Sequence, residues 1–99
     1  MDVTILLGSS SDLPIAQKCT KILEHFDVPY QLRVASAHRS PKFVEQIVGD
    51  AIDEGCSVFI AMAGLAAALP GAVAALTTKP VIGVPCGGRV PYDSLLSIA

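Results

Sequence analysis

The sequence predicts an α/β fold: a parallel β-sheet covered by helices on both faces, in three layers. Short, continuously apolar runs, typical of strands buried on both faces, alternate along the chain with longer segments of helical periodicity. Because crossovers between parallel strands are right-handed, this alternation places helices on both sides of one sheet. The 99 residues suit a single α/β domain spanning 1–99.

The composition of the chain argues against several classes of function. The formal net charge of -2, with 52% hydrophobic residues, argues against a nucleic-acid or membrane-surface partner, which would need clustered Lys and Arg. High apolar content also suggests that some surface is hidden against other subunits. The first apolar run is too short for a signal peptide or membrane span. Three cysteines without CxxC spacing (Cys19, Cys56 and Cys86) favour free thiols in the cytoplasm over disulfides or a zinc site.

The first third of the chain predicts a strand, a helix and a second strand. Val3–Leu7 is continuously apolar and reads as a buried strand. In Leu13–Phe26 the apolar residues recur at helical spacing, so we expect them to face the core: Ile15, Ala16, Cys19, Ile22, Leu23 and Phe26. Tyr30–Ala35 alternates, which predicts an edge strand with Val34 on its drier face and Gln31 on its wetter one.

The remainder predicts two more strands, each after a helix. A helix closing near Gly55 has apolar residues at helical spacing: Phe43, Val44, Ile47, Val48, Ala51 and Ile52. The further expected elements are a strand at Cys56–Ala63, a helix at Gly71–Leu76, a strand at Pro80–Pro85 and the opening of a helix at Asp93–Ala99. Such a sheet normally has another strand, so we expect a fragment or a shortened chain.

A polar loop, Gly8–Asp12, follows the first strand. Gly8 permits a tight turn with close approach to a ligand, and Asp12 suits an N-cap ahead of the helix. Capping needs only one of the four polar residues that follow Gly8, so the surplus hydroxyls of Ser9 and Ser11 favour a ligand role. The alternative is a well-capped helix start.

A second polar turn, Ser36–Ser40, follows the second strand. His38 has a side chain that can exchange protons near neutral pH, and Arg39 offers a planar cation suited to phosphate. Both polar turns lie at the carboxyl edge of a parallel sheet, where such folds bind ligands, so we expect them to share one crevice. The residues of the later turn, from Gly64 to Gly71, are small and apolar. This turn can therefore offer a ligand only backbone N–H groups and surroundings that exclude water.

These motifs, with the segments Leu69-Pro70-Gly71, Lys79–Pro85 and Asp93–Ser97, resemble one known family. It is the family of N5-carboxyaminoimidazole ribonucleotide mutase and the phosphoribosylaminoimidazole carboxylase catalytic subunit. The resemblance spans the whole chain in one register. It implies a flavodoxin-like (Rossmann-like) three-layer fold, here lacking the last strand and C-terminal helix, and a cytoplasmic homo-octamer that needs neither metal nor organic cofactor.

The resemblance implies a purine-biosynthesis enzyme, an isomerase. It would move a carboxylate from the exocyclic nitrogen to the ring carbon of an aminoimidazole ribonucleotide, through enclosed carbon dioxide. His38 would be the proton-transfer residue and Arg39 would clamp the phosphate. The other implied substrate-binding positions are Ser9 at the carboxylate, Asp12 at the ribose hydroxyls, Ser11 and Ser36 assisting at the phosphate, and Gly64 in the carbon dioxide cage.

Other activities stay open. The carboxylase branch, a lyase, adds free carbon dioxide to the same carbon. The mutase branch usually has a histidine before Leu-Pro-Gly, where this chain has Ala68, so a non-catalytic nucleotide-binding homologue is a further alternative. An FMN-binding electron carrier would need aromatic residues around the flavin, and only Tyr92 is offered. A phospho-receiver module would need an aspartate after the third strand, and Ala61–Leu65 has none.

Overall fold

The computed structural model describes residues 2–35, 41–64 and 68–86. The elements follow in the order β1 (Val3–Leu7), the short 3-10 turn η1 (Ser10–Asp12), α1 (Leu13–His25), β2 (Tyr30–Val34), α2 (Pro41–Asp53), β3 (Val58–Ala63), α3 (Leu69–Ala74) and β4 (Val81–Pro85). Strands and helices therefore alternate as the sequence predicts. The helix expected at Asp93–Ala99 lies outside the described residues.

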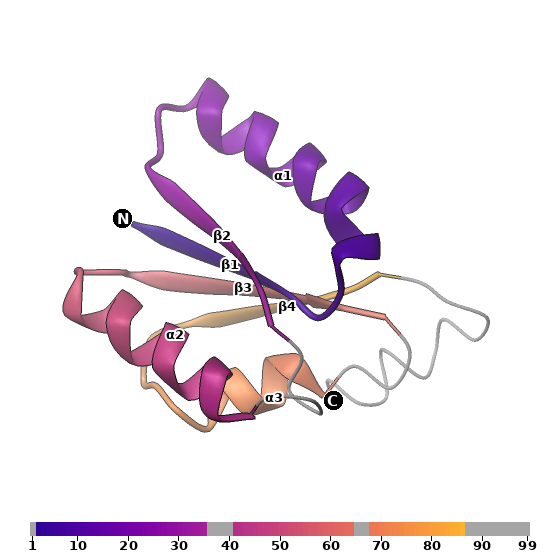
Figure 1. Ribbon diagram of the computed structural model, residues 1–99. Helices are drawn as coiled ribbons and strands as arrows, with labels where there is room; N and C mark the ends of the chain where they lie inside the picture. The colour runs from indigo at the N-terminus through magenta and orange to yellow at the C-terminus, as the bar shows by residue number, and fades with distance from the viewer. Residues whose placement is uncertain (1, 36–40, 65–67, 87–99) are drawn as a thin grey trace.

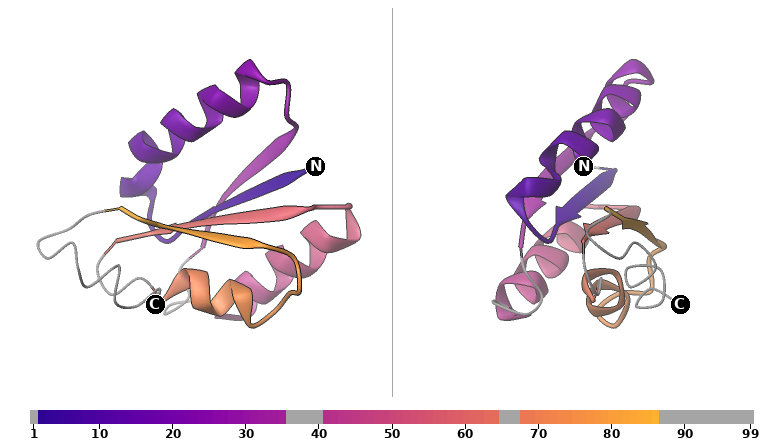
Figure 2. Two further views of the ribbon diagram at one scale, coloured as in Figure 1. Left: turned by 180° about the vertical axis from the view of Figure 1, so that it is seen from behind. Right: turned by 90° about the vertical axis from the view of Figure 1, so that its right-hand side faces the viewer.

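The four strands form one parallel sheet in the order β2-β1-β3-β4. β1 is central, with Val3 paired to Tyr30 of β2 on one side and to Val58 of β3 on the other. Figure 1 shows α1 on one face of the sheet and α2 and α3 on the other, and the side view in Figure 2 separates the three layers. The predicted parallel sheet with helices on both faces is confirmed, and β2 is an edge strand.

Each face of the sheet has its own core. Alternate residues of β1 explain this, because neighbouring side chains of a strand point to opposite faces. Leu6 packs on the side of α2 and α3, whereas Ile5 and Leu7 pack on the side of α1. α2 supplies one stripe of buried residues to its core: Val44, Ile47, Val48 and Ala51. All five residues of β1 are buried, as predicted for a strand covered on both faces.

Fewer apolar residues of α1 and α2 are buried than their helical spacing suggests. Ile22 and Phe26 are 60% and 69% exposed, and Phe43 and Ile52 are also exposed. The physical reason is geometric: an apolar stripe can cover more of a helix than the flat surface of the sheet can contact. The prediction that Ile22 and Phe26 face the core was wrong.

The alternation predicted for β2 holds at three of its five positions, because Tyr30 and Leu32 pack against the core cluster beneath α1 and Arg33 is exposed, but it is wrong at two. Val34 is 46% exposed, whereas Gln31 is half-buried. The Gln31 side-chain amide donates to Thr4 Oγ1 at 3.1 Å, and that hydroxyl donates to Cys56 Sγ at 3.2 Å. A polar contact to the central strand therefore draws Gln31 inward, and Val34 stays exposed at the sheet edge.

Some element boundaries differ from those expected. β3 begins at Val58, not Cys56, and α3 spans Leu69–Ala74, not Gly71–Leu76. Cys56 instead belongs to the turn that ends α2, where its N–H donates to the Ala51 carbonyl at 2.9 Å. The predicted turn before α3 is shorter, because a proline is accepted in the first turn of a helix.

Candidate functional site

The strand order reverses at β1. The chain passes from β1 to β2 on one side and then crosses back to β3 on the other. Open parallel sheets bind ligands outside the carboxyl ends of the strands at such a reversal. Here that point lies between the end of β1 and the end of β3, so we expect a ligand to bind there.

The two strand ends are held close together. The N–H of Gly8 donates to the carbonyl of Met62 at 2.9 Å. A Cβ at Gly8 would lie 3.4 Å from the Ala63 Cβ, so a glycine lets the serine loop leave β1 directly beside β3. Gly64, half-buried, follows β3 at this same place. The structure therefore brings the serine loop and Gly64 together.

The serine loop makes its own hydrogen bonds. Ser9 Oγ accepts the backbone N–H of Ser11 at 3.2 Å and lies 2.9 Å from Ser11 Oγ. The Ser9 carbonyl accepts the N–H of Asp12 at 3.1 Å. Both serine side chains are exposed, so their hydroxyls remain accessible to a ligand.

The side chain of Asp12 does not cap α1. It occupies the N-cap position of α1, but its side chain makes no capping hydrogen bond, and the cap of η1 is Ser9 instead. Asp12 is 7% exposed, and its Oδ2 atom has no hydrogen-bond partner among residues 2–35, 41–64 and 68–86. Burial raises the pKa of this carboxyl, and a backbone hydrogen bond from Ser9 opposes that rise. A buried acceptor without a donor is costly, so Asp12 fits a ligand role better than a capping role.

Cys86 lies at the same edge of the sheet, although the sequence pattern did not single it out for a ligand role. It follows β4 directly, and its N–H donates to the Ala63 carbonyl at 2.9 Å. The half-buried thiol has a raised pKa, caused first by burial and second by the negative charge of Asp12. A cysteine placed immediately after the last apolar strand is the signal that could have found it, because that position lies at the ligand-binding edge.

The predicted residues Ser36, His38 and Arg39 lie outside the described residues. The chain enters their segment from Ala35, whose N–H donates to the Leu7 carbonyl at 2.8 Å. It leaves that segment at Pro41, the first residue of α2. The segment that contains them is therefore attached at the same carboxyl edge as the serine loop.

Metal and membrane sites find no support in the described residues. Among them, no cluster of three or more His, Cys, Asp or Glu side chains is placed to hold a metal ion. No helix in this part of the chain is long and apolar enough to cross a membrane. The described site offers hydroxyls, one carboxylate, one thiol and backbone groups.

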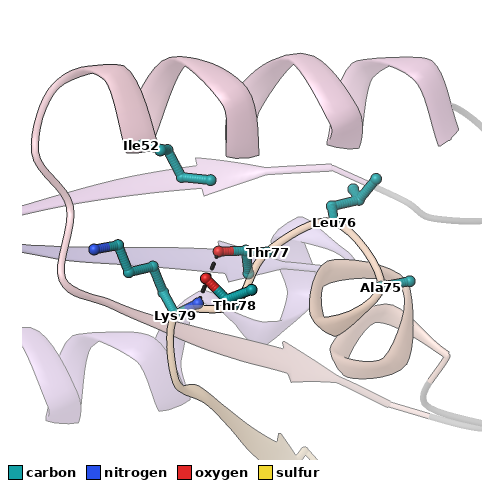
Figure 3. A pocket seen from close by; sticks show the side chains of 6 residues that line it. All are labelled: Ile52, Ala75, Leu76, Thr77, Thr78 and Lys79. Carbon is teal, nitrogen blue, oxygen red and sulfur yellow. Dashed lines mark hydrogen bonds between the residues drawn. The ribbon is translucent and has the colours of Figure 1, made fainter.

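A cavity of about 450 Å³ opens at the other edge of the sheet. Figure 3 shows its lining by the end of α2 and by the connection from α3 to β4: Ile52, Ala75, Leu76, Thr77, Thr78 and Lys79. Within it the Lys79 N–H donates to Thr77 Oγ1 at 3.0 Å, which is an ordinary turn. The cavity lies at the amino edge of the strands, away from Asp12, and contains no residue predicted for chemistry.

Comparison with known proteins identifies the relationship. Residues 2–99 match the sequence model of the family described as AIR carboxylase. The chain belongs to the AIR carboxylase family. It is 54% identical over 96 residues to the N5-carboxyaminoimidazole ribonucleotide mutase of Methanocaldococcus jannaschii, covering 96% of this chain and 59% of that protein.

Other members of the AIR carboxylase family agree. A probable N5-carboxyaminoimidazole ribonucleotide mutase of Methanobrevibacter smithii is 56% identical over 96 residues, covering 96% of this chain and 28% of that protein. The crystal structure of Treponema denticola PurE superposes with a TM-score of 0.85 at 31% identity, covering 96% of this chain and 61% of that one. The flavodoxin-like fold is thus confirmed. The chain spans less than two thirds of the length of these relatives.

Proposed function

We propose that this protein interconverts N5-carboxyaminoimidazole ribonucleotide and 4-carboxyaminoimidazole ribonucleotide in purine biosynthesis. The observation that supports this most is the serine loop with its buried Asp12, placed beside Gly64 where the strand order reverses. Relatives named as the mutase support the same reading. A cytoplasmic homo-octamer that uses no cofactor belongs to the same proposal.

The reaction exchanges a nitrogen–carbon bond for a carbon–carbon bond and moves a proton from the ring carbon to the nitrogen. The bond between the exocyclic nitrogen and the carboxylate carbon breaks, giving carbon dioxide and the free aminoimidazole, and carbon dioxide then bonds to the ring carbon. That carbon loses a proton and the nitrogen gains one. In the proposal His38 moves the proton, because imidazole can accept and donate near neutral pH.

In the proposal the remaining residues bind the ribonucleotide and enclose the carbon dioxide. Arg39, helped by Ser36 and Ser11, holds the phosphate, and Asp12 accepts hydrogen bonds from the ribose hydroxyls. Ser9 lies by the carboxylate. Gly64 and the apolar turn after it keep carbon dioxide beside the imidazole and exclude water, so that recombination is intramolecular.

A second candidate is carboxylation of aminoimidazole ribonucleotide by free carbon dioxide. It is favoured by the 47% identity over 98 residues to the phosphoribosylaminoimidazole carboxylase of Candida glabrata, of which this chain covers 17%. Ala68, the half-buried N-cap of α3, stands where the mutase branch usually has a histidine. A non-catalytic nucleotide-binding homologue is the third outcome.

One assay separates the three. The full-length protein is incubated with 4-carboxyaminoimidazole ribonucleotide in buffer freed of bicarbonate, and separately with aminoimidazole ribonucleotide plus bicarbonate. The mutase forms the N5-carboxy compound in the first mixture. The carboxylase forms the 4-carboxy compound only in the second, and a non-catalytic homologue changes neither rate while still binding the ribonucleotide.

A further inference from the structure

The hydroxyls of Ser9 and Ser11 share one hydrogen bond, with 2.9 Å between the two oxygens, and either oxygen can be the donor. The backbone N–H of Ser11 donates to Ser9 Oγ at 3.2 Å whichever way that bond runs. Both side chains are exposed in the loop that joins the end of β1 to α1 (Figure 1). One arrangement of heavy atoms therefore allows two arrangements of the hydroxyl hydrogens.

Each arrangement leaves a single O–H free for a ligand. A hydroxyl has one hydrogen to donate and two lone pairs that accept. When Ser11 donates to Ser9, Ser9 Oγ accepts two hydrogen bonds and its own O–H is free. When Ser9 donates to Ser11, the free O–H belongs to Ser11. As long as the two serines stay bonded to each other, they supply one donor and not two.

A bound anion selects between the two arrangements. A hydrogen bond to a charged group is roughly twice as strong as one between neutral groups, so the free O–H is the one next to the negative charge. Two anions, one at each serine, both receive an O–H only if the bond between the serines breaks. Because this pair is exposed to water, we expect that loss to change an equilibrium constant by about threefold, at the low end of the usual range.

We propose that Ser9 and Ser11 act as one donor shared between the carboxylate and the phosphate of the substrate. This role rests on the proposed function, which puts Ser9 at the carboxylate and Ser11 at the phosphate. While the carboxylate is bonded to nitrogen, the free O–H is that of Ser9.

Formation of carbon dioxide then reverses the bond between the two serines. Carbon dioxide is neutral, so the O–H of Ser9 turns back to Ser11, and Ser11 donates to the phosphate. Each oxygen keeps its own hydrogen, and only the directions of the two O–H bonds change. The loop therefore holds aminoimidazole ribonucleotide most tightly during the interval in which carbon dioxide lies free beside it.

The first test measures the coupling between the two anionic groups of the ligand. Four ligands are titrated calorimetrically: 4-carboxyaminoimidazole ribonucleotide, aminoimidazole ribonucleotide and the dephosphorylated form of each. The full-length protein carries His38→Asn, so that no ligand is converted during the titration. The gain in affinity from the carboxylate should be at least about threefold smaller when the phosphate is present than when it is absent.

Variants of Ser11 separate the shared donor from simple repulsion between the two anions. Ser11→Ala removes the hydroxyl and keeps the backbone N–H on Ser9, so the coupling should fall about threefold and leave only the repulsion. Ser11→Thr keeps a hydroxyl and should retain the full coupling. Ser10→Ala, at the exposed neighbouring serine, should retain it as well. The same coupling in Ser11→Ala as in the parent protein would overturn the proposal.

The second test needs no ligand. Ser9→Ala, Ser11→Ala and the double variant are unfolded in urea. Both single variants lose the same bond between the hydroxyls, so the double variant should change the unfolding equilibrium constant about threefold less than the product of the two single changes. Fully independent effects would mean that the two hydroxyls are not bonded to each other, and the shared donor would be wrong.

Two outcomes distinguish the shared donor from the proposed function. If the ligands bind with the expected coupling but the unsubstituted protein transfers no carboxylate, the proposed function alone is overturned. If carboxylate transfer is normal but the two anionic groups of the ligand bind without any coupling that depends on Ser11, the shared donor alone is overturned.

Discussion

The hydroxyl of Ser9 accepts the backbone N–H of Ser11 at 3.2 Å, two residues further along the chain. The same hydroxyl lies 2.9 Å from Ser11 Oγ. These contacts fix the shape of the loop before any ligand arrives, so its hydroxyls need little rearrangement on binding. Such preorganisation lowers the entropic cost of association.

Ser9→Ala should therefore affect both stability and binding. Loss of the cap should lower the free energy of unfolding by about 1 kcal/mol, measured by urea denaturation, and should weaken ribonucleotide binding. Ser10→Ala is the matched control, because the exposed Ser10 side chain makes no hydrogen bond within the described part of the chain. Equal stability of the two variants would contradict the capping role of Ser9.

Asp12→Asn should stabilise the fold at neutral pH by a few tenths to about 1 kcal/mol. The folded pKa of Asp12 is raised above its ordinary value, chiefly by burial. The carboxyl of Asp12 therefore binds its proton more tightly in the folded state than in the unfolded state. As the pH rises from the ordinary pKa through the raised pKa, this group lowers the free energy of unfolding. The gain from Asp12→Asn should shrink as the pH is lowered toward 4, in urea titrations at several pH values. A constant difference at all pH values would show that charge is not the cause.

His38→Asn should lower the rate of carboxylate transfer at least about 100-fold and leave ribonucleotide affinity nearly unchanged, since it removes a proton-transfer group. His25→Asn is the control on a second histidine, which lies in the last turn of α1 against Phe26, with ring centroids 5.0 Å apart. Single-turnover kinetics and equilibrium binding measure the two effects. Near-normal turnover in His38→Asn would refute the assignment.

Arg39→Ala should weaken binding of the phosphorylated substrate about tenfold or more, with less effect on its dephosphorylated analogue. Arg33→Ala is the control, because Arg33 stacks over the Phe43 ring at 5.8 Å from its centroid and has no predicted phosphate role. Calorimetric titration with both ligands gives the comparison. Equal losses for the two ligands would remove the phosphate role of Arg39.

The ends of the two long helices give a paired prediction on stability. Asp27 closes α1 at φ 55° and Gly55 closes α2 at φ 87°. In each turn the next N–H reaches back to a helix carbonyl, at 2.9 Å from Val28 to Leu23 and from Cys56 to Ala51. Asp27→Gly should raise the free energy of unfolding by roughly 0.5–1 kcal/mol, and Gly55→Ala should lower it by about 1 kcal/mol. Changes of the same sign in the two variants would contradict this account.

The layers of the fold could be predicted from the sequence, but which residues of each helix are buried could not. β1 could be located from its sequence, because a strand covered on both sides is mostly apolar, although Thr4 within it is polar and hydrogen-bonded. Periodicity located α1 and α2 as well. It could not show that Ile22 and Phe26 stay exposed, because that depends on how much of each helix the sheet covers.

The candidate site could be predicted in part. A ligand role for the serine loop was predicted from its surplus of hydroxyls, and the structure places that loop at the carboxyl edge of the sheet. The role of Asp12 was misread, because η1 already provides hydrogen-bond partners at the start of α1: the Asp12 N–H reaches the Ser9 carbonyl and the Leu13 N–H reaches the Ser10 carbonyl. Cys86 was not singled out because its place beside the end of β3, where its N–H reaches the Ala63 carbonyl, depends on the strand order.

The central place of β1 affects how the protein must be made. β1 is synthesised first, yet its Leu7 partner on β3 is Met62. At translation speeds of roughly 5–20 residues per second, the ribosome needs about 3–11 s to add the residues between them. For that interval a strand with four apolar residues out of five waits with its β3 side unpaired, so we expect chaperones that recognise nascent hydrophobic chains to bind β1 until β3 emerges.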